Sequence, residues 1–141
     1  MQVPLREVNA LPFEIWREEG VIRLIFTRGA CIDAPALKEL LRVLGAVDPA
    51  GTAPVLVEQE ERAHMDGTAR ELLRRMQHRP ARPVAFMAYD LEDRVHGAML
   101  GRVYNARFPF RSFVWKEEAL RWLEGWLRSP HLRVLRGCDR G

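Results

Sequence analysis

The chain has 141 residues, of which 48% are hydrophobic and 29% are charged, and its formal net charge is +3. This length suits one domain with a sizeable core, and no apolar run approaches the roughly 20 residues that a membrane-spanning helix needs. The first residues carry an acid and lack the apolar segment of a signal peptide, while the cysteines, Cys31 and Cys138, are too far apart in sequence to indicate a disulfide. We therefore expect a single cytoplasmic domain over residues 1–141.

The N-terminal third predicts an irregular arm, a hairpin and a helix. Residues 1–12 hold two prolines and show no periodicity. Residues 13–17 and 21–27 mix apolar and polar residues as strands do, on either side of Gly20, which tolerates the positive φ of a tight turn. Asp33 can then cap a helix. The apolar face of that helix consists of Leu37, Leu40, Leu41 and Leu44.

The most informative stretch begins at Pro54. The continuous run Val55-Leu56-Val57 indicates a strand that is covered on both faces, as in a parallel sheet. The polar residues that follow predict a loop, and Asp66 can cap a second helix. The predicted inner face of this helix is Ala69, Leu72, Leu73 and Met76.

The last third repeats the alternation of strand and helix. Residues 84–89 form another continuous apolar run, and Asp90 can cap a helix that reaches about Asn105. Gly97 and Gly101 lie one helical turn apart and would let another element approach closely. The predicted inward residues of this helix are Val95, Ala98, Met99 and Val103. Residues 111–115 predict a final strand, followed by a helix from Lys116 and a loose tail over 129–141.

The element order is therefore ββαβαβαβα. Parallel strands that alternate with helices require right-handed crossovers, which gives an α/β fold with a five-stranded mixed sheet and about four helices.

Three strings also carry a family likeness: Glu14 to Leu24 in the hairpin, Pro54 to Val57 in the central strand, and Phe113 to Leu123 with its Glu-Glu-Ala-Leu-x-Trp-Leu ending. Over about residues 13–127 the chain resembles the bacterial SpoIIAA-like (STAS-like) proteins. The resemblance implies that fold and a non-enzymatic regulatory or protein-binding role. Anti-sigma-factor antagonists of this fold carry a phosphorylated serine in an Asp-Ser-Ser-Gly loop, where this chain has His64-Met65-Asp66-Gly67. Asp66 thus occupies the phosphoacceptor position.

A geometric argument gives the candidate site independently. In parallel α/β sheets, ligands bind beside the loops that leave the carboxyl ends of the strands. The loops expected at this edge are residues 28–33, 60–67, 89–90 and 115–117. The candidates among them are His64, Asp66, Gly67, Tyr89 and Asp90. Asp66 is either a simple helix cap or a permanent negative charge that fixes one binding state, and His64 is either solvated or titrates near neutral pH.

Catalysis is not expected, because Cys31, His64 and Asp66 match no hydrolase spacing and Cys31 is more simply a buried thiol. No residues have the spacing of a metal site, and no cofactor is expected. The competing function is that of a carrier or sensor of a small apolar or lipid ligand, which would need an apolar cavity.

Two surfaces could contact partners. Arg70, Arg74, Arg75 and Arg79 form either a solvated helix face or a docking surface for an acidic protein, an anionic membrane or nucleic acid. The absence of aromatic residues among them argues against nucleic acid. Trp122 lies off the apolar stripe of its helix, which favours an exposed position in a contact with an unknown protein partner or in a homodimer.

Overall fold

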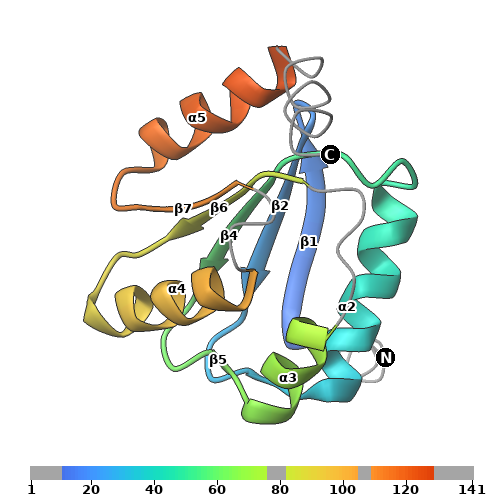
Figure 1. Ribbon diagram of the computed structural model, residues 1–141, viewed down its shortest axis with the longest axis vertical. Helices are drawn as coiled ribbons and strands as arrows, with labels where there is room; N and C mark the ends of the chain where they lie inside the picture. Colours follow the sequence, from blue (N-terminus) through green and yellow to red (C-terminus); the bar gives the residue numbers. More distant parts are fainter. Residues whose placement is uncertain (1–10, 76–81, 105–108, 129–141) are drawn as a thin grey trace, which may run out of the picture.

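The computed structural model describes residues 11–75, 82–104 and 109–128, and it has a mixed sheet with helices on both faces (Figure 1). The strands are β1 (Phe13–Glu18), β2 (Val21–Phe26), β3 (Cys31–Ile32), β4 (Val55–Gln59), β5 (His64–Met65), β6 (Val84–Met87) and β7 (Phe110–Phe113). The helices are α2 (Ala34–Val47), α3 (Gly67–Arg75), α4 (Leu91–Tyr104) and α5 (Lys116–Arg128).

The main sheet has the strand order β1-β2-β4-β6-β7. β1 and β2 form the predicted antiparallel hairpin, and the other neighbours are parallel. The hairpin turn uses positive φ at Glu19 (52°) and Gly20 (84°). The predicted α/β class, the five-stranded mixed sheet and the four helices are thus confirmed for the described ranges, and β4 has the predicted buried core at Val55-Leu56-Val57.

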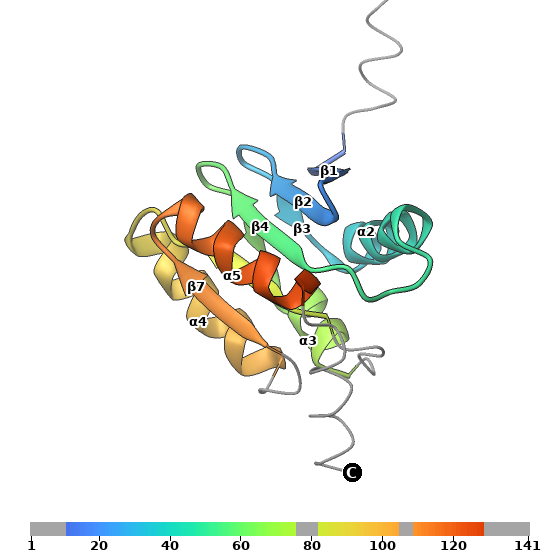
Figure 2. The ribbon, with the colours of Figure 1, turned by 90° about the horizontal axis from the view of Figure 1, so that it is seen from above.

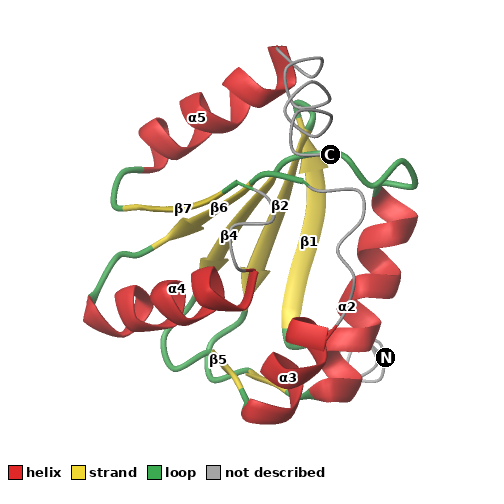
Figure 3. Cartoon of the chain, in the orientation of Figure 1, coloured by secondary structure: helices red, strands yellow, loops and turns green. Residues whose placement is uncertain are grey.

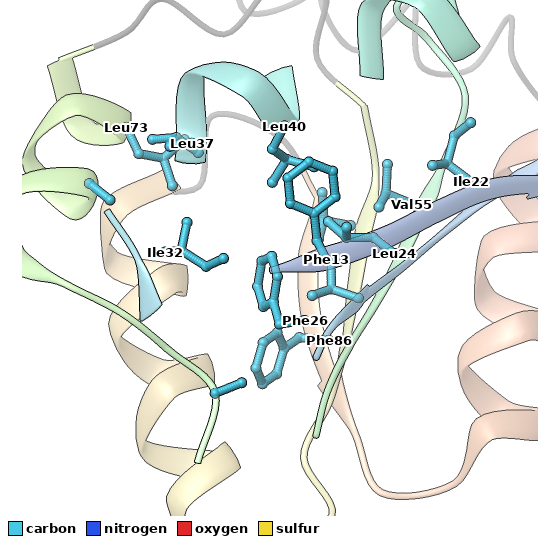
Figure 4. Packing of buried hydrophobic residues seen from close by; sticks show 14 of the residues in the cluster. Phe13, Ile22, Leu24, Phe26, Ile32, Leu37, Leu40, Val55, Leu73 and Phe86 are labelled. Atoms are coloured by element: carbon cyan, nitrogen blue, oxygen red, sulfur yellow. The ribbon is translucent and has the colours of Figure 1, made fainter. Parts of the chain in front are cut away.

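The larger core fills the face of the sheet that α2, α3 and α4 cover. Phe13, Leu24 and Phe26 of the hairpin pack there with Phe86 of β6 and Leu37 of α2 (Figure 4). The Asp33 carboxylate accepts a 2.9 Å hydrogen bond from the Ala36 N–H, which confirms this helix cap.

α5 lies on the opposite face of the sheet from the other three helices (Figure 2). Ala119 and Leu123 of α5 are fully buried against Leu56, Ala85 and Met87. The two faces of the central strands therefore belong to separate cores, which explains why β4 and β6 are apolar without alternation.

Several local predictions were wrong. β4 extends beyond the predicted Val55-Leu56-Val57 run through Glu58 and Gln59. His64 and Met65 were expected in a loop, but they pair with Cys31 and Ile32 in a small parallel sheet, which satisfies their backbone hydrogen-bonding groups. Cys31 is consequently exposed rather than buried.

The inner face of α4 also differs from the prediction. Val95 is 52% exposed and Ala98 is exposed, whereas Asp93 and Gly97 face inward. The predicted close approach at the glycines is confirmed: a Cβ atom on Gly97 would lie 2.8 Å from Ser112 Oγ and 3.0 Å from Phe86 Cδ1.

Met76, Arg79, Asn105, Cys138 and most of the predicted arm and tail (1–10 and 129–141) lie outside the described residues, as does the side chain of Val103. Within the described ranges, none of the helices combines the length and the apolar character needed to cross a bilayer.

Candidate functional site

The candidate residues at the carboxyl edge fall into two groups, and the first group surrounds the start of α3. The Asp66 carboxylate accepts hydrogen bonds from the Ala69 N–H (2.9 Å) and the Thr68 hydroxyl (2.7 Å). These two hydrogen bonds hold the pKa of Asp66 below its usual value. Asp66 is therefore the cap of α3, as predicted, and its negative charge is stabilised there.

Gly67 and Asp66 border an open hollow of about 590 Å³ between α2 and α3. Its other lining residues include Lys38, Glu71 and Arg75, so both signs of charge are present. His64 precedes this group on β5 and is exposed, with its Nδ1 atom 3.4 Å from the Arg62 carbonyl oxygen. No ligand chemistry follows from this mixture of charges.

The second group, Tyr89 and Asp90, lies after the carboxyl end of β6, and its hydrogen-bond partners are on β4 and α4. The Tyr89 hydroxyl donates a 2.8 Å hydrogen bond to Glu58 Oε2, and the Tyr89 N–H donates to Asp93 Oδ2 at 3.0 Å. Asp90 accepts from the Asp93 N–H at 2.8 Å and so caps α4, as predicted. The five candidates thus fall into two groups. His64, Asp66 and Gly67 lie around the start of α3, and Tyr89 and Asp90 lie just before α4.

Glu58 is the centre of a cluster that the sequence did not indicate. It lies at the end of β4, is only 9% exposed, and receives the Tyr89 hydroxyl, the Arg23 guanidinium at 3.0 Å and the Lys116 ammonium at 3.3 Å. Burial alone would raise the pKa of Glu58, but the hydrogen bonds from Tyr89 and Arg23 and the charge of Lys116 outweigh it and lower the pKa. Burial and the neighbouring carboxylate raise the pKa of Tyr89. The cluster therefore holds an ionised Glu58 and a neutral Tyr89.

Arg23 connects this cluster to the hairpin. Its guanidinium carbon lies 5.4 Å from the centre of the Trp16 ring, and Glu18 is a second carboxylate 3.5 Å away. Arg23 Nε is buried without a hydrogen-bond partner in the described part of the chain. Arg23 therefore depends on Glu58 for most of its charge compensation.

A third polar group lies on the other face of β4. Gln59 Nε2 donates to Asp93 Oδ1 at 3.1 Å and lies 2.6 Å from His96 Nδ1. Because Asp93 also accepts the Tyr89 N–H, this buried carboxylate joins β4, the β6–α4 loop and α4. Sequence periodicity missed Asp93 because an acid in a first helical turn is normally read as a solvated residue.

Large apolar side chains are exposed beside the Glu58 cluster. We define the apolar tip as Tyr89, Leu91, Val95, Val114 and Trp115. Leu91 is 75% exposed and Trp115 is 64% exposed. These residues follow β6 and β7, whose carboxyl ends are joined by a 2.8 Å hydrogen bond from the Ala88 N–H to the Phe113 carbonyl. The loops that enter α4 and α5 lie on the same side of the molecule in Figure 3.

Glu58 binds both loops of the apolar tip. Tyr89 lies in the first loop, and Lys116 directly follows Trp115 in the second. A single buried carboxylate thus fixes two exposed apolar segments relative to the sheet, and preorganisation of this kind reduces the entropy cost of binding.

The predicted basic surface is partly neutralised. Arg70 donates to the Met65 carbonyl oxygen, and Arg74 and Arg75 both pair with Glu71. Arg79 is outside the described residues. The described arginines therefore have local structural partners.

Trp122 differs from its expected exposure. It is half-buried, and its ring centre lies 5.6 Å from that of Phe113 and 6.3 Å from that of Trp126. Trp122 therefore packs against β7 from α5.

No cluster of three or more His, Cys, Asp or Glu side chains among the described residues could hold a metal ion.

Comparison with known proteins gives one family match. The model of a family described as a domain of unknown function (DUF7793) matches residues 15–127, which includes every strand of the main sheet except the start of β1. No curated protein and no solved structure matches the chain.

Proposed function

The chain belongs to the DUF7793 family of unknown function, and from this premise we propose that it is a cytoplasmic, non-enzymatic protein-binding domain with a regulatory role. The binding surface is the apolar tip. The observation that carries the proposal is that exposed large apolar residues lie on the loops after β6 and β7 and at the start of α4, with Glu58 bound to Tyr89 in the first loop and to Lys116 after the second.

Single exposed apolar residues are normal on protein surfaces, but a cluster is typical of interaction sites. All but one of the large hydrophobic residues that are exposed in the described ranges belong to the apolar tip, and the exception is Leu11. Tyr and Trp, which dominate the binding energy of many interfaces, are both present.

The charges around the apolar tip specify the chemistry of the partner. Four acids, Asp90, Glu92, Glu117 and Glu118, are exposed beside it and outnumber the exposed Arg94, whereas Lys116 is paired with Glu58. The matching surface is an apolar patch with lysines or arginines at its rim, and added salt should slow association with it.

The likeness to the SpoIIAA-like fold agrees with this role. The five-stranded mixed sheet and the position of Asp66 before α3 are what that likeness leads one to expect. We propose that the carboxylate of Asp66 makes regulation independent of phosphorylation, since its charge is held by Thr68 and Ala69. Substitution of Asp66 by Ser tests this, because unchanged partner binding would refute it.

A carrier of apolar or lipid ligands has less support. The apolar hollow bordered by Phe26, Met65 and Leu100 has a volume of about 20 Å³. This is close to the space of one water molecule, whereas small-molecule sites usually occupy at least about 300 Å³.

Site-specific photo-crosslinking in the native cell tests the proposal. A photoreactive amino acid at Val95 places the probe on the apolar tip, at an exposed position without a polar contact. The same amino acid at Arg75 on α3 is the matched control. We expect one crosslinked protein that is specific to position 95 and is lost when Trp115→Ala is added.

Equal crosslinking from both positions, or crosslinking from position 95 that Trp115→Ala leaves unchanged, would contradict the proposed surface. The captured protein should also show a basic rim around its own contact, which a crosslinked peptide map would identify.

A further inference from the structure

β7 is the terminal strand of the main sheet, and no described strand pairs with its outer edge. The carbonyl groups of Pro109 and Phe113 bond inward to β6. Because the groups of a strand alternate in direction, the N–H and C=O of Ser112 point to the outer edge. At the opposite edge of the sheet, α2 lies along β1 (Figure 2).

Apart from the shortness of this four-residue strand, the outer edge of β7 has little of the usual protection against pairing among the described residues. β7 contains no proline and no bulge, and its one charged side chain, Arg111, lies back over the ring of Phe113 at 5.1 Å. An exposed edge of this kind is a template for another strand.

The helices beside β7 carry a charge gradient along the edge. α4 leads from the carboxyl end of β6 to the amino end of β7, and α5 leaves the carboxyl end of β7 and runs back (Figure 1). Each has exposed acids in its first turn, Glu92 in α4 and Glu117 with Glu118 in α5. Each has a base in its last turn, Arg102 and Arg128 respectively. The edge is therefore acidic at the carboxyl end of β7 and basic at the amino end.

We propose that the partner at this edge is a second copy of this chain, paired antiparallel along β7 about a two-fold axis. Antiparallel pairing is the arrangement that brings the acidic end of one copy to the basic end of the other, on both helices at once. The two five-stranded sheets then form one continuous sheet. Parallel pairing would oppose like charges.

This dimer is compatible with the position of Trp122 and leaves the apolar tip usable. Trp122 packs on Phe113 beside the pairing edge, so it supports β7 from α5. Antiparallel pairing places the two apolar tips at opposite ends of the joined strands. The inference does not depend on the proposed function, because it uses the backbone of β7 and the charged helix ends.

Sedimentation equilibrium of the full chain tests the edge directly. Ser112→Pro removes the outward N–H and leaves the bonds to β6, so we expect the dimer dissociation constant to rise at least tenfold while the circular dichroism spectrum is unchanged. Glu14→Lys, an exposed change on the β1 edge, should leave dimerisation unaltered.

Charge reversal tests whether the two copies pair antiparallel along β7. This test does not require the proline variant to fold. One variant carries Glu92→Lys with Glu117→Lys, and the other carries Arg102→Glu with Arg128→Glu. Each alone should be monomeric at concentrations where the wild type is dimeric, and an equimolar mixture should form a heterodimer.

A wild type that stays monomeric, a dimer that neither Ser112→Pro nor charge reversal weakens, or a mixture that does not associate would overturn the proposal. Crosslinking from position 95 in a monomeric Ser112→Pro variant would still report on the apolar tip, so the two proposals fail separately.

Discussion

Glu58 illustrates how a single charged residue can organise an edge of the sheet. Glu58 is a charged residue in a buried strand whose preceding residues are apolar. Three side chains that are distant in sequence contact it: Arg23, Tyr89 and Lys116. The sequence could not predict this cluster, because a polar residue after Val57 reads as the start of a loop until its partners are known. Asp66 and Asp90 were predictable as caps, because capping depends on neighbours in sequence.

Substitution of Glu58 by Gln keeps the shape of the side chain but leaves the largely buried Arg23 with only the exposed Glu18 carboxylate, 3.5 Å away, to balance its charge. We expect a loss of about 3 kcal/mol in the free energy of unfolding, measured by urea denaturation. Glu18→Gln, which changes an exposed carboxylate near the same arginine, is the control and should cost well under about 1 kcal/mol. Equal effects of the two changes would mean that Glu58 has no special role.

The lowered pKa of Glu58 also predicts a pH dependence. The folded state releases the proton more readily than the unfolded chain, so the stabilisation is complete above the ordinary glutamate value of 4.5 and is lost as the pH falls through the lowered native pKa. Stability curves between pH 6 and pH 2 (the range to be scanned) should therefore fall more steeply for the wild type than for Glu58→Gln. Parallel curves would show that Glu58 does not contribute to this loss.

At the scale of elements, α4 shows where hydrophobic periodicity fails. Val95 and Ala98 were expected inward but are exposed, because Gly97 and Gly101 allow the helix to approach β7 and Phe86 through the opposite surface. The spacing of the glycines correctly predicted which face of α4 packs on the sheet, whereas the pattern of apolar residues predicted the wrong face. Val95 then contributes to the apolar tip, so this failed prediction marks the proposed binding surface.

Gly97→Ala tests this close approach. Alanine favours a helix by up to about 1 kcal/mol, but its Cβ atom would collide with Ser112 and Phe86, and overpacking typically costs about 1–3 kcal/mol. We expect a net loss of stability in thermal unfolding. Gly125→Ala in α5, where no atom lies within 4 Å of the added Cβ, should instead stabilise the protein. A stabilising Gly97→Ala would contradict the packing of α4.

For the whole molecule, the order of strands and helices was predictable because continuous apolar runs and caps recur along the chain. That α5 alone covers one face of the sheet could not be predicted, because each helix has a similar apolar stripe. The β3–β5 pairing was missed because each strand has only two residues. Of the apolar tip, Tyr89 and Trp115 lie in loops that the sequence placed at the functional edge of the sheet. Leu91 and Val95 were missed because they belong to a helix, and Val114 was missed because it was assigned to a strand.

The central claim is that Glu58 holds the apolar tip in a conformation that binds a protein partner. The most direct measurement is the affinity of the purified crosslinked partner for wild type, Trp115→Ala, Glu58→Gln and Arg74→Ala, by isothermal titration calorimetry at a temperature where all four are folded. We predict a loss of at least about tenfold for Trp115→Ala and a smaller loss for Glu58→Gln, with Arg74→Ala unchanged. Equal affinity of the wild type and Trp115→Ala would contradict the account.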